Sequence, residues 1–121
     1  MVESGLCQEE VHVGDDLDLY QFPTPWWHEG DGGQYIGTTA AVITADAETG
    51  YTNYGLYRAM IKDKQTLTLN ARGLPFGQSP RGYGTASHIF QNEMRGNPTP
   101  IALALGMDPR LTYSCLLYTS D

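Results

Sequence analysis

The chain is poor in several features that define common classes of protein. Only 2 of its 121 residues are cysteines, and Cys7 and Cys115 stand near opposite ends without CxxC or other metal-ligand spacing. Two free thiols are therefore predicted, and no disulfide framework is indicated. No apolar run approaches the roughly 20 residues of a membrane helix, and the acidic N-terminus lacks the regions of a secretory signal. We therefore expect a cytoplasmic protein with no membrane partner.

Basic residues are also scarce. Lys and Arg number 7 against 14 Asp and Glu, which gives a formal net charge of -7. A surface of that sign repels phosphate backbones, so the composition argues against a nucleic-acid partner. All the basic residues lie at or after Arg58, and from there on the local balance is positive. We therefore expect any anionic ligand to be bound by this half of the chain.

Several catalytic motifs are missing as well. The sequence has no GxSxG elbow, no HExxH, no P-loop and no GxGxxG that opens a helix after a strand. Hydrolase, zincin, nucleoside triphosphatase and Rossmann interpretations therefore lack their residues. His28, Glu29 and Asp31 lie close together in a glycine-rich segment, where a metal cluster is one interpretation. Such residues more often cap turns, which is the interpretation we favour.

What is present predicts one folded, turn-rich domain. Hydrophobic residues make up 40% of the chain, and Gly (14) and Tyr (8) are plentiful. This balance is typical of a β-leaning globular protein with a single core. Glycine and proline punctuate residues 1–33, so we interpret this stretch as an extended lead-in segment.

Three β-like runs follow, separated by two turn signals. They read QYIGTTAAVITA, TNYGLYRAMI and TLTLNA, and the turns are Glu48–Gly50 and Asp63–Gln65. The first two runs are rich in β-branched and aromatic residues, and the third alternates threonine with leucine. We therefore predict an antiparallel three-stranded meander within Gln34–Ala71, with no helix in Thr52–Ile61.

The second half predicts a loop, a helix and a strand. Glycine and proline mark Arg72–Gly84 as a loop. Ala86–Arg95 is predicted to be a helix, with Ser87 as a possible cap and Gly96 followed by proline at its end. Its partial apolar stripe consists of Ile89, Phe90 and Met94. Pro100–Gly106 is a short apolar run that fits a fully buried strand. The predicted class is therefore α+β, rich in β structure.

Three longer segments carry a family resemblance. They are PTPWWHEGDGGQYIGT (Pro23–Thr38), ETGYTNYGLYRAMI (Glu48–Ile61) and NPTPIALALGMDP (Asn97–Pro109). In this order and spacing they resemble the UbiD-family decarboxylases, whose patterns include P-x-P-x-x-H-x-x-D-G-G-x-Y-I and T-G-x-x-N-x-G-x-Y-R. The histidine-containing first segment is more similar to the phenolic and ferulic acid decarboxylases than to the quinone-pathway enzymes.

The resemblance implies a function. Members of this family use prenylated FMN, a divalent metal (often Mn²⁺) and K⁺ to decarboxylate aromatic or α,β-unsaturated acids, and the parent protein is expected to be a homo-oligomer. Their cofactor sits in a split β-barrel domain. By resemblance, residues 34–112 form part of such a domain, and the substrate is a small-molecule acid.

Candidate site residues are identified by matching positions of this sequence to the family motifs. Asn53 takes the place of an asparagine that helps to bind the metal and cofactor, and a carboxamide oxygen suits such an ion. Arg58 takes the place of an arginine that contacts cofactor and substrate carboxylate, which makes it the predicted catalytic residue. Thr38 and Leu56 match positions that line the flavin, and the main chain near Tyr54 matches the K⁺ neighbourhood.

The two central residues also have plainer interpretations. Taken without the family, Asn53 is an ordinary residue beside a turn and Arg58 a solvent-facing strand residue. They are five positions apart, so a regular strand would send their side chains to opposite faces. If both serve one cofactor, the strand must be irregular between them, and Gly55 is the expected site of a bulge.

Two departures from the family pattern bear on activity. Gly84 lies near the place of a metal-binding histidine, with His88 as a possible substitute. The family's metal-binding and acid-base glutamates lie downstream of the third segment, whereas residues 113–121 do not resemble the family and are similar to adapter read-through. A truncated product is therefore expected. The alternative to a decarboxylase segment is an inactive fragment or a flavin-binding module.

Overall fold

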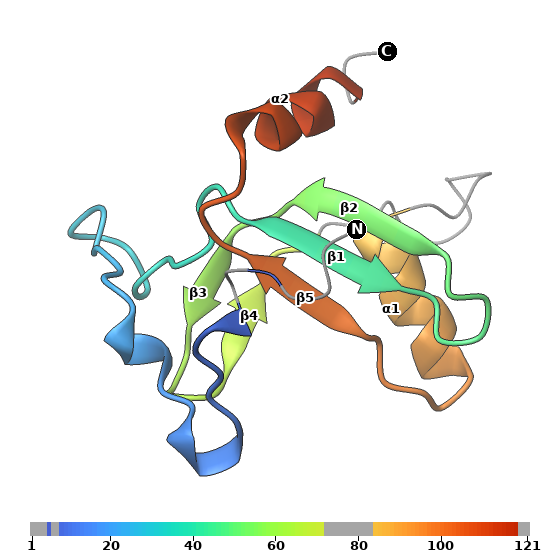
Figure 1. Cartoon of the computed structure of the whole chain (residues 1–121), viewed down its shortest axis with the longest axis horizontal. Coiled ribbons are helices and arrows are strands. Elements are labelled where there is room, and N and C mark those ends of the chain that lie inside the picture. Colours follow the sequence, from blue (N-terminus) through green and yellow to red (C-terminus); the bar gives the residue numbers. More distant parts are fainter. Residues whose placement is uncertain (1–4, 6–7, 72–83, 119–121) are drawn as a thin grey trace.

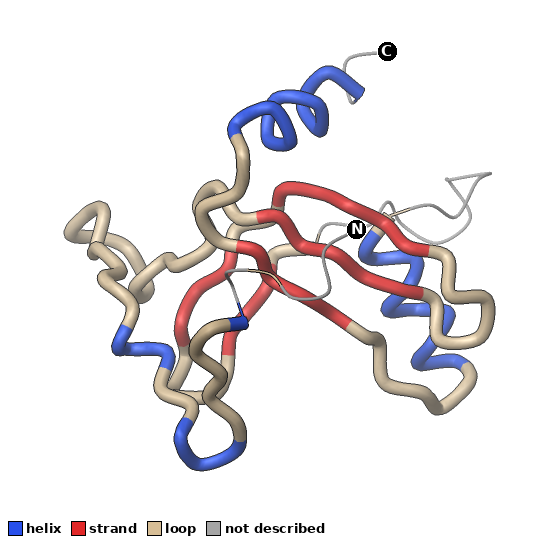
Figure 2. The backbone as a smooth tube through the Cα atoms, viewed as in Figure 1, coloured by secondary structure: helices blue, strands red, loops and turns tan. Residues whose placement is uncertain are grey.

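The structure is a computed structural model that describes residues 5, 8–71 and 84–118. Its strands form two antiparallel sheets, accompanied by helices (Figures 1 and 2). The predicted α+β class is confirmed. The described strands do not close into a barrel, and the split-barrel assignment and the boundaries at residues 33 and 112 stay predictions.

The larger sheet has the order β2-β1-β5. Its strands are β1 (Ala41–Ala45), β2 (Thr52–Leu56) and β5 (Ile101–Ala104). Ala41 pairs with Leu56 in β2 and with Ala104 in β5. The predicted hairpin between the first two runs is confirmed, because β-branched residues dominate β1 and a turn with Gly50 at φ 68° joins it to β2.

The predicted single meander is wrong. The second run is divided between β2 and β3 (Ala59–Ile61), and β3 pairs with β4 (Leu67–Leu69) in a separate sheet. The segment before β1 accounts for this division, because Gly37 N–H donates to the Ala59 carbonyl (3.1 Å) and Ile61 N–H donates to the Gln34 carbonyl (2.9 Å). These bonds draw β3 away from β1. No helix occurs in Thr52–Ile61, as predicted.

The expected bulge at Gly55 is also wrong. Gly55 is buried and pairs regularly with Val42, and the chain leaves the ladder only after Leu56. A glycine is needed here for space, because a Cβ at this position would collide with the ring of Tyr57. The irregularity therefore lies at Tyr57 and Arg58, between the two sheets.

Helix α1 (Thr85–Met94) lies within one residue of its predicted bounds, but it differs in detail. Gly84 occupies the N-cap position, and the Ser87 hydroxyl accepts a hydrogen bond from Gln91 instead of capping. Gly96, at φ 74°, follows the last turn as predicted.

The buried face of α1 is polar and not the predicted apolar stripe. Thr85, His88 and Asn92 are buried, whereas Met94 is 72% exposed. The reason is that the end of β1 presents polar backbone groups that need partners. Asn92 supplies them, because its side chain accepts from Ala47 N–H (2.9 Å) and donates to the Ala45 carbonyl (3.1 Å) and to the Thr99 hydroxyl (3.1 Å).

The C-terminal elements correct two further expectations. Ile101 in β5 is 57% exposed, because β5 is an edge strand with β1 as its one neighbour, so the prediction of full burial is wrong. Helix α2 (Pro109–Tyr118) was not predicted. It follows Met107, whose sulfur accepts a hydrogen bond from the Tyr54 hydroxyl (3.4 Å).

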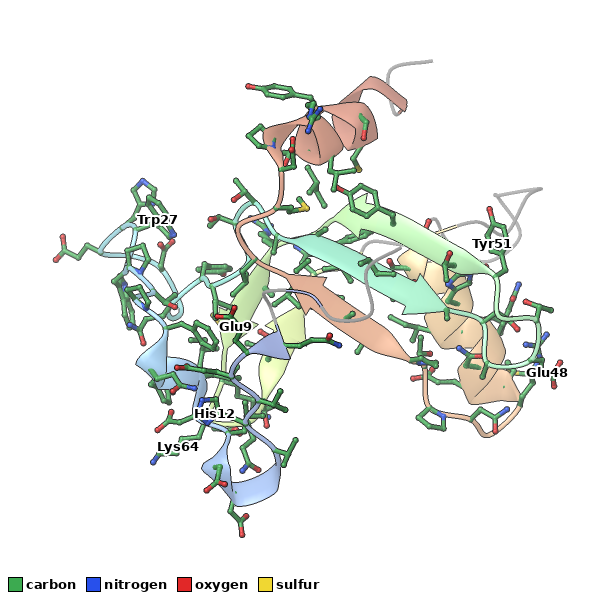
Figure 3. The ribbon with its side chains drawn as sticks, in the orientation of Figure 1. Glu9, His12, Trp27, Glu48, Tyr51 and Lys64 are labelled. Atoms are coloured by element: carbon green, nitrogen blue, oxygen red, sulfur yellow. The ribbon has the colours of Figure 1, made fainter. Side chains whose placement is uncertain are left out.

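The lead-in packs against the β3–β4 hairpin. It contains the short 3-10 helices η2 (Gly14–Asp16) and η3 (Leu19–Gln21). Lys64, labelled in Figure 3, lies at the contact, where its carbonyl accepts from Leu19 N–H (2.8 Å) and its ammonium pairs with Asp18 (3.2 Å). This contact ties the N-terminal loops to the second sheet.

Some sequence expectations fall outside the described residues. The predicted glycine-rich loop includes residues 72–83, and Cys7 also lies outside, whereas Cys115 is a free thiol. Within the described part, no helix has the length and apolar character that crossing a bilayer requires.

An ion pair at the β1–β2 turn predicts sensitivity to acid. Asp46 is 5% exposed, and hydrogen bonds from Thr49 N–H and from the Arg95 guanidinium (2.8 Å) hold the pKa of its carboxyl far below the usual range. A carboxyl with a lowered folded-state pKa stabilises the fold above its unfolded pKa of about 4, and this contribution is lost as the pH falls below that value.

We expect Asp46→Asn, which keeps the turn acceptor but removes the charge, to lower the melting temperature at pH 7. The deficit against wild type should shrink as the pH falls below about 4. Thermal unfolding between pH 3 and pH 7 measures it, with the exposed Asp15→Asn as the matched control. A deficit that stays constant across this range would contradict the assignment.

Candidate functional site

The His28 segment forms a turn. The His28 backbone N–H donates to the Asp31 carboxylate (3.0 Å), and the Asp31 N–H donates to the His28 carbonyl (3.0 Å). This arrangement is the capped turn that we favoured from the sequence. The described residues contain no group of three or more His, Cys, Asp or Glu side chains placed to hold a metal.

Next to this turn lies a cleft of about 490 Å³, which we call the Arg58 cleft. This volume lies within the range of small-molecule sites. Its lining residues are Trp27, His28, Asp31, Tyr35, Thr38, Thr39 and Arg58. Figure 3 shows Trp27 near the tip of a loop that projects away from the sheets. The structure therefore brings two of the predicted site residues, Thr38 and Arg58, to one cleft, together with two aromatic side chains.

The backbone explains how these residues meet. Thr38 directly follows Gly37, which is bonded to Ala59, and Arg58 directly precedes that same alanine. The contact is so close that a Cβ on Gly37 would lie 2.9 Å from the Ala59 Cβ. Gly37 therefore permits the loop before β1 to lie against the start of β3. Arg58 itself is exposed and belongs to neither sheet.

Asn70, which the sequence analysis did not identify, forms hydrogen bonds with Arg58. Asn70 N–H donates to the Arg58 carbonyl (3.1 Å). A guanidinium carries only donors, so the Asn70 amide turns its oxygen toward it. In that orientation the oxygen accepts from Arg58 Nε (3.1 Å) and Nη2 (3.0 Å). The β3–β4 register brings the two residues together, because Ala59 lies opposite Leu69 and Arg58 and Asn70 are their outer neighbours.

Asn53 lies at a different place, beside the start of α1. Its Nδ2 donates to the hydroxyl of Thr85 (3.1 Å), the first residue of the helix. With the amide nitrogen engaged, the carbonyl oxygen is the atom that suits a hard divalent ion. The N-terminus of a helix also favours phosphate groups. The Asn53 carbonyl oxygen would therefore suit a hard divalent ion, and a group of three or more His, Cys, Asp or Glu side chains that could complete such a site does not occur among the described residues.

The structure does not place Asn53 and Arg58 side by side. Asn53 belongs to the regular β2 ladder, where it lies opposite Thr44. Arg58 comes after the end of this ladder and contacts Asn70. The strand ladder ends after Leu56, so the strand is irregular between Asn53 and Arg58.

The remaining candidates have other surroundings. Leu56 pairs with Ala41 and is not among the residues that line the Arg58 cleft, so its role beside a flavin stays a prediction. A K⁺ site near the Tyr54 main chain also stays a prediction. Burial raises the pKa of the Tyr54 hydroxyl, so this group remains protonated at neutral pH.

His88 belongs to a buried polar cluster between α1 and β1. It is 3% exposed, and its Nδ1 lies 3.0 Å from the Thr44 hydroxyl. The Thr44 hydroxyl also donates to Thr85 (3.5 Å), and the Tyr51 ring meets the imidazole edge-on. These contacts give His88 a hydrogen-bonding role in packing, and a ligand role for it stays a prediction.

Comparison with known proteins yields a family match over almost the whole chain. Residues 1–120 match the UbiD family model, described as the 3-octaprenyl-4-hydroxybenzoate carboxy-lyase Rift-related domain. The match therefore includes the three sequence segments that resemble the family. It also extends through most of residues 113–121.

Individual relatives match at similar levels. The chain is 38% identical over 103 residues to the uncharacterized protein sll0936 of Synechocystis, which covers 85% of this chain and 19% of that protein. It is 33% identical over 110 residues to a pyrrole-2-carboxylic acid decarboxylase of Pseudomonas aeruginosa, covering 89% and 20%. It is 30% identical over 116 residues to a phenolic acid decarboxylase of Sedimentibacter hydroxybenzoicus, covering 92% and 22%. The chain thus spans about a fifth of the length of these relatives.

Proposed function

Because this chain belongs to the UbiD family, we propose that it is the cofactor-binding segment of a decarboxylase that acts on aromatic or α,β-unsaturated carboxylic acids. The proposed cofactors are prenylated FMN, a divalent metal such as Mn²⁺, and K⁺. The proposed setting is a cytoplasmic homo-oligomer. One observation carries the proposal: the guanidinium of Arg58 borders a cleft that two aromatic side chains, Trp27 and Tyr35, also line.

The chemistry of decarboxylation assigns a task to each of these groups. The guanidinium of Arg58 is a planar cation whose paired N–H groups hold a carboxylate at two points, which orients the bond that must break. The rings of Trp27 and Tyr35 offer flat apolar faces against which an aromatic or unsaturated acid can stack. When bound, the modified flavin would supply an acceptor for the electron pair released as carbon dioxide leaves.

Thr38 and Asn53 are proposed to help bind the cofactor. Thr38 offers a hydroxyl at the edge of the same cleft. Asn53 offers its carbonyl oxygen to a divalent metal at the start of α1. A positive ion there would offset the charge of a phosphate, which a chain with a formal charge of -7 otherwise repels.

The second candidate function is a flavin-binding module without decarboxylase activity. The position of Gly84 favours it, because this glycine lies where the family pattern has a metal-binding histidine. A glycine offers no side-chain ligand, so a metal at Asn53 would be held by fewer groups. Loss of the metal ligand would separate cofactor binding from chemistry.

The test is an activity assay on the full-length protein that carries this chain. The protein is purified with reconstituted prenylated FMN, Mn²⁺ and K⁺, and carbon dioxide release is measured with pyrrole, phenolic and cinnamic acids. We expect release from at least one class of acid. A protein that retains the cofactor but releases no carbon dioxide from any class would favour the flavin-binding module.

Asn53→Ala in that protein tests the metal assignment. We expect bound metal and cofactor to fall first, and excess Mn²⁺ to recover part of the activity, because one hard ligand is removed while the others remain. Metal content and flavin absorbance are measured after gel filtration, with the exposed Asn97→Ala as the matched control. Full metal and cofactor occupancy in Asn53→Ala would remove this residue from the metal site.

A further inference from the structure

Arg58 borders more than one cleft, and within the described part of the chain its guanidinium is held by the side chain of Asn70. Besides the Arg58 cleft, it borders a second cleft of about 370 Å³ together with Tyr35, Met60, Thr68, Leu69 and Asn70. Among the described residues, the amide of Asn70 is the group that accepts hydrogen bonds from the guanidinium. The position of the guanidinium between the two clefts is therefore set by this contact.

The geometry of the contact matters for carboxylate binding. A guanidinium has five N–H donors, and the Asn70 oxygen accepts from Nε and Nη2, which lie along one edge of the group. Three donors remain, and they include the pair on Nη1 and Nη2 that can hold a carboxylate at two points. Asn70 thus occupies the edge that a substrate does not need.

A backbone hydrogen bond restrains the contact between Asn70 and Arg58. Asn70 directly follows β4, and its N–H bonds to the Arg58 carbonyl (3.1 Å), so the same two residues are joined by main chain and side chain. An unrestrained arginine side chain has many rotamers, and it loses this freedom when it binds a ligand. A partner that restricts it beforehand lowers the cost of binding the substrate.

We propose that Asn70 is a positioning residue, which holds the Nε edge of Arg58 so that its outer edge receives the substrate carboxylate. The inference rests on the proposed function for the role of Arg58, whereas the contact itself does not depend on it. The side chain of Asn70 is uncharged, and this is part of its role. An aspartate at position 70 would hold the guanidinium equally well but would also cancel its charge toward an anionic acid.

The contact is tested on the 121-residue chain by NMR. The Nε–H of Arg58, assigned by its absence in Arg58→Lys, should exchange with solvent about fivefold faster in Asn70→Ala than in wild type. The matched control is Asn97→Ala, which makes the same change at an exposed asparagine outside both clefts that Arg58 borders. Equal exchange rates in wild type and Asn70→Ala would overturn the proposal.

The role is tested by kinetics in the full-length protein. We expect Asn70→Ala to lower kcat about tenfold, since a hydrogen bond to a charged group is lost. Asn70→Asp should restore kcat but raise the KM for the acid. If Arg58→Lys is impaired while Asn70→Ala turns over at the wild-type rate, the positioning role is wrong. If Arg58→Lys is also unimpaired, the proposed role of Arg58 fails and the positioning role fails with it.

Discussion

We expect the purified 121-residue chain to release no carbon dioxide from aromatic or cinnamic acids, even when prenylated FMN, Mn²⁺ and K⁺ are supplied. The chain spans about a fifth of the decarboxylases it resembles. The acid-base glutamates that the family resemblance implies lie downstream of its last matching segment. General acid-base groups typically contribute about 10² to 10⁴ in rate, so a segment assayed without these glutamates is expected to turn over near background.

The assay needs two controls. The full-length protein in the same mixture shows that the cofactor is competent, and flavin absorbance after gel filtration shows whether the 121-residue chain binds it. Binding without turnover agrees with a cofactor-binding segment. Carbon dioxide release above background by the pure chain would contradict the expectation and place the whole acid-base machinery within these residues.

Arg58→Lys in the full-length protein is expected to lower kcat about 100-fold while leaving stability nearly intact. Lysine keeps the positive charge but replaces a planar fork by a point donor, so it cannot hold a carboxylate at two points. A misplacement of about 1 Å costs roughly 10²-fold in rate. Stability should change little, because Arg58 is exposed and belongs to neither sheet.

Three measurements separate the possible outcomes for Arg58→Lys: turnover, cofactor occupancy and melting temperature. The matched control is Arg110→Lys, which makes the same change at an exposed arginine paired with Asp108, away from the Arg58 cleft. Wild-type turnover in Arg58→Lys would remove the catalytic role. A large loss of melting temperature would instead make Arg58 a residue of the fold.

Local patterns in the sequence determined the elements that depend on near neighbours. The β1–β2 hairpin, the end of α1 at Gly96 and the turn at His28 were all predictable, because turn residues and β-branched runs act over a few positions. The family motifs likewise pointed to Thr38 and Arg58, which the structure brings to one cleft.

Tertiary structure decided where these elements go. TNYGLYRAMI has one continuous β-like pattern, yet the bonds from Gly37 and to Gln34 divide it between two sheets. The polar face of α1 is buried because backbone groups at the end of β1 require the side chain of Asn92. Periodicity within one segment carries no information about such distant partners.

The candidate site shows the same division. The sequence places Arg58 within the second β-like run, whereas the register of β3 and β4 decided that Asn70 accepts two of its hydrogen bonds. An asparagine after a threonine-leucine strand has no pattern that marks it as a partner. Its role arises because hydrogen bonds form between atoms that folding brings within about 3 Å, however far apart they lie in the chain.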